Sequence, residues 1–387
     1  MNMFQTILRQ NLFKNLQPIP PDPILGLVAK FKADPNPAAL NLAQGAYRCN
    51  QGQPYVLPSI QKAELQISQA LNNGDIDKEY LGIEGHPEFL KLTAKFAFGN
   101  TYTDLHSKLA TVQTLSGTGA LRIAAETLKQ IGKVSKIYLS NPSWGNHAKI
   151  FQAAGLETES YNYLDQETGT KLDFNSFVSD LETIPEGSVV LLHACAHNPT
   201  GVDPNPSQWN TLSDIFQRRQ LIPLFDSAYQ GYASGDADLD ALSIRTFAKN
   251  KGIETMLVCQ SYAKNMGLYG ERVGALNVLT KTIEEKEAVL SQIKQKIIRP
   301  MYSSPPLHGA RLGKRRRSNV AVIIVRIVFI GSFLFYCLLL NHSFPTNPNS
   351  ITNCFKLFSL LQLTTTLLLR RFLIFEQLVC CWTNLPN

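Results

Sequence analysis

Cysteine is scarce in most of this chain, and the cysteines present are not arranged in pairs. The first 310 of the 387 residues contain only Cys49, Cys195 and Cys259, and four more cysteines follow in the last 77 residues. No CxxC pair occurs in the first 310 residues. This excludes a disulfide scaffold and a cysteine-rich zinc domain, and it is typical of a protein from a reducing compartment.

A secretory signal is also missing. Residues 1–21 contain no acidic residue, two basic residues (Arg9 and Lys14) and no long apolar core. The segment lacks the arginine and serine richness of most mitochondrial presequences, so it indicates a mitochondrial leader only weakly.

An excess of positive charge is absent from the body of the chain. The net charge of +7 arises after residue 310, where nine basic residues face one acidic residue. The first 310 residues contain 28 basic and 29 acidic residues, a net charge of −1. A nucleic-acid partner is therefore not expected. With 44 % hydrophobic residues, the chain can form large cores, and its length predicts two or three domains.

Short apolar runs alternate with helix-length segments between residues 54 and 280. The predicted strands are 111–115, 136–139, 189–196, 221–225 and 255–260, and the predicted helices are 120–131, 209–219 and 239–249. Two of the strands, 189–196 and 255–260, are almost continuously apolar, as strands buried on both faces are. The alternation predicts an α/β domain with a mainly parallel sheet.

Polar and aromatic residues follow each predicted strand. These segments are 116–119, 141–147, 197–201, 226–229 and 261–264. Because ligands bind beyond the carboxyl ends of parallel strands, we expect these segments to form one site. Gly117 and Gly119 at a helix start suggest a phosphate cradle, and Lys264 after a buried strand suggests an amine with a lowered pKa that can form a Schiff base.

Structural explanations exist for each of these residues. A Gly-x-Gly pair can form a simple turn, Asp226 can cap a helix, and Trp144 can belong to a core.

Two other kinds of active site fit the sequence less well. His193, Cys195 and His197 are metal-ligand types at strand spacing but lack a fourth ligand, so no metal is expected. The Ser261-x-x-Lys264 pattern also occurs in serine acylases, but their Lys-Thr-Gly and Ser-Asp-Asn motifs are missing.

Residues 261–274 resemble the lysine signature of the class I pyridoxal-phosphate aminotransferases, and within them the aspartate aminotransferase branch. Supporting similarity lies in residues 21–26, 45–48, 54–58, 78–81, 116–122, 144–147, 193–201, 226–231 and 298–302. The resemblance covers about residues 11–311. It implies a type I pyridoxal-phosphate fold: α/β, with a mainly parallel seven-stranded sheet flanked by helices and the smaller domain largely missing from this chain.

The resemblance also implies a role for each site residue. Lys264 would hold pyridoxal 5′-phosphate as a Schiff base and move the proton, and Asp226, supported by His147, would pair with the ring nitrogen. Tyr229 and Asn198 would bind the ring's phenolic oxygen, and Trp144 would stack on the ring. The implied phosphate ligands are Ser116, Gly117, Thr118, Ser261, Arg272 and Tyr80, the last from the other subunit of a homodimer.

The implied reaction is reversible amino transfer between L-aspartate and 2-oxoglutarate, giving oxaloacetate and L-glutamate. Gly45, Trp144 and Asn198 would contact the substrate, and Arg299 of the partner subunit would bind its distal carboxylate in a bidentate fork. The Val202-Asp203 pair resembles the mitochondrial form of the family, so we expect the mitochondrial matrix, with the cytoplasm as the alternative. An aromatic aminotransferase is the alternative within the family.

The resemblance divides the chain into four parts: an arm (1–22), the first part of a small domain (23–54), a large cofactor-binding domain (55–311) and a tail (312–387).

The tail does not resemble the family. In particular, it has no counterpart of the arginine that binds the substrate's α-carboxylate in the family. We interpret it as translated non-coding sequence of a truncated or mis-spliced gene model, because composition changes abruptly and Gly313-Lys314 fits a read-through splice donor. The alternative is an inactive protein that binds the cofactor and is either degenerate or anchored in a membrane. Residues 320–340 are long enough to span a bilayer but contain Arg326.

Overall fold

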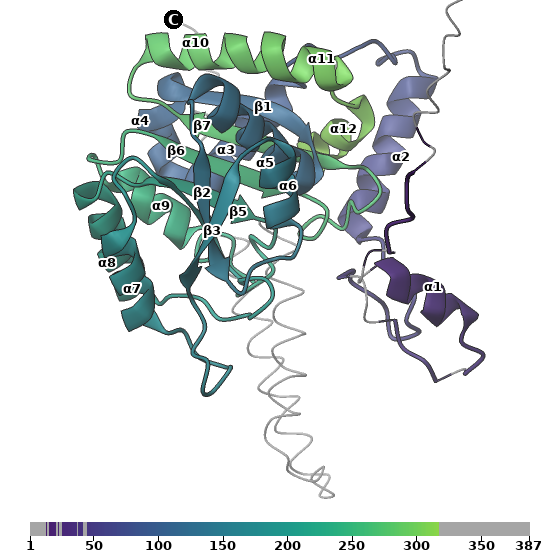
Figure 1. Ribbon diagram of the computed structural model, residues 1–387. Helices are drawn as coiled ribbons and strands as arrows, with labels where there is room; N and C mark the ends of the chain where they lie inside the picture. Colours follow the sequence, from purple (N-terminus) through teal and green to yellow (C-terminus); the bar gives the residue numbers. More distant parts are fainter. Residues whose placement is uncertain are drawn as a thin grey trace, which may run out of the picture. The chain divides into compact units, whose positions relative to one another are not determined.

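The computed structural model describes residues 13, 15–20, 22, 25–36, 38–41 and 45–316, and these contain a single seven-stranded sheet (Figure 1). Its strands are β1 (Leu109–Leu115), β2 (Lys136–Asn141), β3 (Glu157–Asn162), β4 (Val189–His193), β5 (Ile222–Ser227), β6 (Met256–Ser261) and β7 (Val273–Leu279). Their order is β1-β7-β6-β5-β4-β2-β3. Strand β7 is antiparallel to both neighbours, and all other pairs are parallel. The mainly parallel seven-stranded sheet is confirmed.

The central strands are apolar on both faces because helices cover both. In β4, Val189 and Leu191 pack into one core with helices α5 and α6, whereas Val190 and Leu192 pack into a second core with helices α7, α8 and α9. This alternation follows from the two-residue period of a strand. It explains why the run 189–193 lacks polar residues before His193.

The helices connect successive strands or cover the sheet. Their bounds are α1 (Leu25–Ala33), α2 (Pro58–Asn72), α3 (Pro87–Phe98), α4 (Tyr102–Leu105), α5 (Ser116–Glu126), α6 (His147–Ala153), α7 (Phe174–Thr183), α8 (Pro206–Arg218), α9 (Leu242–Lys249), α10 (Ile283–Gln292), α11 (Arg299–Tyr302) and α12 (Leu307–Arg316). Figure 1 shows α10 and α11 running one after the other past β1 and β7, the two strands at one side of the sheet. Helix α12 packs on α2 and α3 around a third core.

Most predicted bounds shift by a few residues, and two of these shifts lie at the site segments. The predicted strand 189–196 ends at His193, and Ala196 takes a left-handed conformation with φ +47°. The predicted helix 120–131 begins four residues earlier, at Ser116, and its last turn is π-helical over Thr127–Ile131.

The predicted tail lies almost entirely outside the described residues. Residues 317–387, including the 320–340 stretch, are not among them. Over the part of the chain that the structure describes, no helix has the length and apolar composition required to cross a membrane.

Candidate active site

The site segments meet at one edge of the sheet. Parallel strands β1, β2, β4, β5 and β6 all have their carboxyl ends there, as predicted. Because β7 runs in the opposite direction, its first residue also lies at this edge, where Val273 pairs with Leu115 and Gly274 with Ser261. This reversal brings Arg272 next to the starts of the other segments, and the Arg272 carbonyl accepts the N–H of Ser116 at 3.0 Å.

Lys264 lies three residues after the end of β6 and is half-buried. Its ammonium donates a hydrogen bond to the carbonyl of Gly45 and lies 5.5 Å from the centre of the Tyr269 ring. Burial and the nearby Arg272 guanidinium lower the pKa of Lys264, because both disfavour the protonated form. The predicted amine with a lowered pKa is therefore present at this position.

Asp226, on strand β5 next to β6, forms a hydrogen-bonded pair with His147. Nε2 of the fully buried His147 donates to Oδ2 of Asp226 at 3.0 Å, and the Ser143 hydroxyl lies 2.8 Å from Nδ1. The Trp144 ring meets the His147 ring edge-on, with 5.2 Å between centroids. These contacts fix the direction in which the partly exposed Asp226 carboxylate points.

Two serine hydroxyls meet at the beginning of helix α5. Ser116 Oγ lies 3.1 Å from Ser261 Oγ, and both residues are buried. A Cβ placed on Gly117 would lie 2.9 Å from Ser261 Cβ, so only glycine fits here without a shift. Thr118 follows in the first turn. Hydroxyls, free helix N–H groups and the positive end of the helix dipole are a suitable setting for a phosphate.

Asn198 and Tyr229 lie on the loops that follow β4 and β5. The backbone N–H of Asn198 donates to Nδ1 of His193 at 3.2 Å, and both Asn198 and Tyr229 side chains are partly accessible. Burial and then the Asp226 charge raise the pKa of Tyr229, so its hydroxyl remains a hydrogen-bond donor at neutral pH.

Tyr80 and Arg299 do not join this cluster within one chain. Tyr80 is 87 % exposed. Arg299 is also exposed, and its Nη1 donates to Ser303 Oγ at 2.5 Å. The remaining predicted residue, Gly45, contacts Lys264 as described above.

Three residues of the site were not predicted from the sequence. Ser143 bonds to His147, His193 accepts the Asn198 N–H, and Tyr269 lies beside Lys264 and accepts the Tyr47 N–H at 2.7 Å. Ser143 and His193 lie within segments that the sequence already singled out, and their partners are only four and five residues away, but no sequence pattern indicates these hydrogen bonds. Tyr269 lies five residues after the lysine, but its bond to the Tyr47 N–H joins residues that are 222 positions apart.

The metal site considered for His193, Cys195 and His197 gains no support from the structure. The strand ends at His193, so His193, Cys195 and His197 do not share one strand face. His197 instead contacts Ser140 and Thr200 at 2.9 Å each. Within the described ranges, no group of three or more histidine, cysteine, aspartate or glutamate side chains is arranged to hold a metal ion.

Comparison with known proteins agrees with this arrangement. A sequence model of the family described as "Aminotransferase class I and II" matches residues 37–315. The mitochondrial aspartate aminotransferase of Xenopus tropicalis is 51 % identical over 295 residues, which are 76 % of this chain and 67 % of that protein. The chain thus spans about two thirds of the length of this curated relative.

Solved structures give the same result. The aspartate aminotransferase from Saccharomyces cerevisiae cytoplasm superimposes with a TM-score of 0.74 at 41 % identity, covering 79 % of this chain and 75 % of that one. An aromatic-amino-acid aminotransferase from Burkholderia pseudomallei, covalently bound to pyridoxal phosphate, gives 0.72 at 37 % identity, covering 78 % and 74 %. This chain belongs to the class I and II aminotransferases.

Proposed function

We propose that this protein is an aspartate aminotransferase that uses pyridoxal 5′-phosphate to exchange the amino group between L-aspartate and 2-oxoglutarate, giving oxaloacetate and L-glutamate. The observation that carries the proposal is the position of Lys264. An amine of lowered pKa lies at the same sheet edge as the Asp226–His147 pair and the hydroxyl-lined start of α5. The similarity to named aspartate aminotransferases supports this substrate class.

The residues present fit pyridoxal phosphate. Gly117 allows the start of α5 to approach Ser261 closely, and the Ser116 and Ser261 hydroxyls that meet there suit the phosphate together with Thr118 and Arg272. Asp226 offers a carboxylate for the ring nitrogen. When bound, the cofactor supplies an aldehyde that combines with amines and a ring that accepts electrons when a substrate proton leaves.

The chain's own residues orient the reactants and move the proton. Lys264 would hold the cofactor through its neutral amine and, once free, would take the proton from the substrate Cα. His147 holds the Asp226 carboxylate in place toward the ring nitrogen. The Asn198 amide and the Tyr229 hydroxyl would donate to the phenolic oxygen, Trp144 would lie against the ring, and Gly45 would leave room for the substrate.

We infer that the active assembly is a homodimer. Tyr80 and Arg299 are exposed in one chain, and their proposed partners, the cofactor phosphate and the distal substrate carboxylate, would belong to the other subunit's site. An arginine fork for that carboxylate favours dicarboxylic substrates over aromatic ones. The mitochondrial relative favours the matrix, and the yeast cytoplasmic enzyme keeps the cytoplasm as the alternative.

Borohydride reduction in the presence of pyridoxal phosphate, followed by peptide mapping, tests the cofactor site. We expect the label on Lys264 and its loss in a Lys264→Arg variant, with Lys136→Arg as the control. A label on another lysine contradicts the assignment. Relative rates with aspartate, glutamate and phenylalanine then test the substrate class, and a preference for phenylalanine contradicts the aspartate proposal.

A further inference from the structure

The loop that carries Asn198 is wrapped around one carboxylate. The backbone N–H groups of Ala196 and His197 donate to Oδ2 and Oδ1 of Asp203 at 2.6 and 2.9 Å. Ala196 has a φ of +47°, which a residue with a side chain adopts only when its surroundings hold it there. Asp203 thus stabilises a tight turn that ends directly before Asn198.

The loop that carries Tyr229 has the same construction. Asp240 is 5 % exposed, and its Oδ2 accepts the N–H groups of Gly231 and Ala233 at 2.7 and 3.0 Å. Its Oδ1 accepts the N–H and the hydroxyl of Ser234 at 3.0 and 2.6 Å. The Ala233 N–H also donates to the Tyr229 carbonyl at 3.2 Å. The turn after Tyr229 is therefore fixed by a single buried carboxylate.

Residues of these two loops line the same cavity. Asp203 and Asp240 both line one cavity of about 230 Å³, together with Cys195. The Ser243 hydroxyl, near the start of α9, donates to the carbonyl of Ala194 at 2.7 Å and joins the two segments. The positions of Asn198 and Tyr229 thus depend on neighbouring loops, each with its own carboxylate at its centre.

We propose that Asp203 and Asp240 are positioning residues that hold the Asn198 amide and the Tyr229 hydroxyl in place at the cofactor's phenolic oxygen. The inference rests on the proposed function, because it needs a bound pyridoxal phosphate to act on. An ionised carboxylate accepts at both oxygens, whereas asparagine offers one acceptor and turns an NH₂ group toward the second N–H. Asparagine at either position therefore loosens its turn while keeping the size of the side chain.

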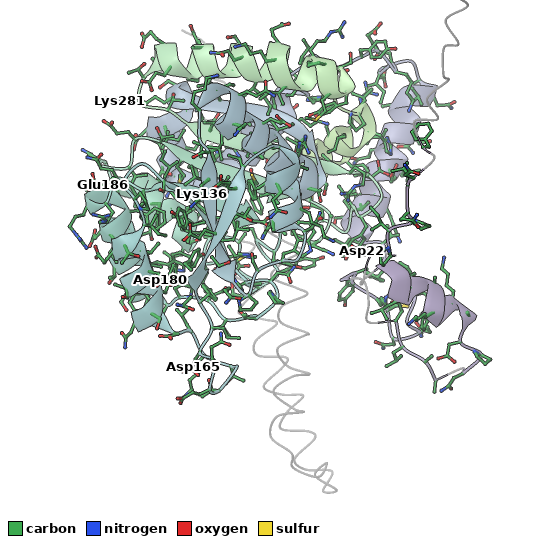
Figure 2. The ribbon with its side chains drawn as sticks, viewed as in Figure 1. Asp22, Lys136, Asp165, Asp180, Glu186 and Lys281 are labelled. Carbon is green, nitrogen blue, oxygen red and sulfur yellow. The ribbon has the colours of Figure 1, made fainter. Side chains whose placement is uncertain are left out.

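The test compares Asp203→Asn and Asp240→Asn with Asp165→Asn. Asp165 is a matched control because its carboxylate also accepts two backbone N–H groups, from Glu167 and Thr168 at 3.0 and 2.8 Å. Figure 2 shows it on a loop below α7. Hydrogen exchange of the full chain should speed up in the peptide spanning 194–202 for Asp203→Asn and in that spanning 229–236 for Asp240→Asn, but in neither for Asp165→Asn.

The second readout is the pH midpoint of the visible absorbance of the bound cofactor. Hydrogen bonds to the phenolic oxygen stabilise its ionised form, so losing one raises the midpoint, by about one pH unit. We expect this rise in Asp203→Asn and Asp240→Asn and not in Asp165→Asn. If Asp203→Asn does not fold, Asp203→Glu, which keeps both acceptors on a longer side chain, should show a smaller rise in the same direction.

Unchanged exchange in the 194–202 and 229–236 peptides overturns the inference whether or not the cofactor binds. Unchanged midpoints in variants that do bind it also overturn the inference and leave the proposed function intact. An unsubstituted chain that gives no cofactor absorbance contradicts the proposed function and, with it, this inference. An equal midpoint rise in Asp165→Asn would show a general loss of stability and would also count against the positioning role.

Discussion

Lys264 and Lys136 have opposite surroundings. Burial and Arg272 lower the pKa of Lys264, whereas the hydrogen bond and charge of Glu159, 2.8 Å away, raise the pKa of Lys136. Trace labelling of the cofactor-free chain with an amine reagent, read by mass spectrometry across a pH series, should therefore modify Lys264 at a lower pH than Lys136. A midpoint for Lys264 equal to or above that of Lys136 would contradict the role assigned to its neutral amine.

Gly117 is a second residue at which the structure predicts the effect of a substitution. A methyl group there would lie 2.9 Å from Ser261 Cβ, which is attached directly to strand β6 and cannot rotate away. We expect Gly117→Ala to destabilise the fold by about 1–3 kcal/mol and to weaken pyridoxal-phosphate binding about tenfold or more, measured by fluorescence titration. Gly145→Ala is the control, because no atom lies within 4 Å of its added Cβ. Equal affinities in the two variants would show that Gly117 is not part of the phosphate cradle.

At the scale of elements, strands β1, β2, β4, β5 and β6 could be predicted from their apolar runs, whereas β3 and β7 could not. Strand β3 has the sequence Glu-Thr-Glu-Ser-Tyr-Asn and buries only Tyr161, so it has no hydrophobic pattern to recognise. Strand β7 is fully buried, but Gly274 and Asn277 interrupt its apolar sequence, and Asn277 bonds to Thr111 and Gln260 of the neighbouring strands. Its existence followed from the family resemblance alone.

The candidate site was predictable where one residue type carries the chemistry, as with Lys264, Asp226 and the small residues 116–118. What could not be predicted are individual hydrogen bonds within the loops, even between residues four to nine positions apart. The Ser143–His147 pair and the aspartates that organise the loops depend on the folded backbone, because their partners are N–H groups and rings with no sequence signature.

Buried histidines next to the site should make the fold sensitive to acid. Burial, followed by the nearby His147, lowers the pKa of His197 to about 3. The unfolded chain takes up a proton at this residue below about pH 6.5 while the folded chain does not, so stability falls as pH drops from that value toward 3. The slope contributed is at most about 1.4 kcal/mol per pH unit.

Urea unfolding at pH 7.5, 6.5 and 5.5 checks this expectation. The variant His197→Gln should lose less stability between pH 6.5 and 5.5 than the unsubstituted chain, whatever its stability at pH 7.5. The exposed His106 supplies the control variant His106→Gln. Parallel pH profiles for His197→Gln and the unsubstituted chain would mean that His197 is protonated in the folded state as well.

At the scale of the molecule, the last described helix is tied firmly to the large domain. His308 of α12 bonds to both carboxylate oxygens of Glu64 on α2 at 3.1 Å, and Arg311 donates to the Asp77 carbonyl at 2.6 Å. Ala310 and Leu312 are fully buried in the third core. The family match reaches residue 315, within this same helix, so the sequence similarity and the burial of Leu312 both extend past residue 311, where the large domain was predicted to end.

The proposed homodimer makes a quantitative prediction, because each site would combine Lys264 of one subunit with Arg299 of the other. We expect Lys264→Ala and Arg299→Ala chains to be almost inactive when expressed separately. When the two variant chains are refolded together in equal amounts, half of the dimers contain one chain of each kind. Each of these mixed dimers has one site with both substitutions and one site with neither. The mixture should therefore regain about one quarter of the activity of the unsubstituted dimer. If each site were instead built within a single chain, every site in the mixture would carry a lesion, and co-refolding would restore no activity.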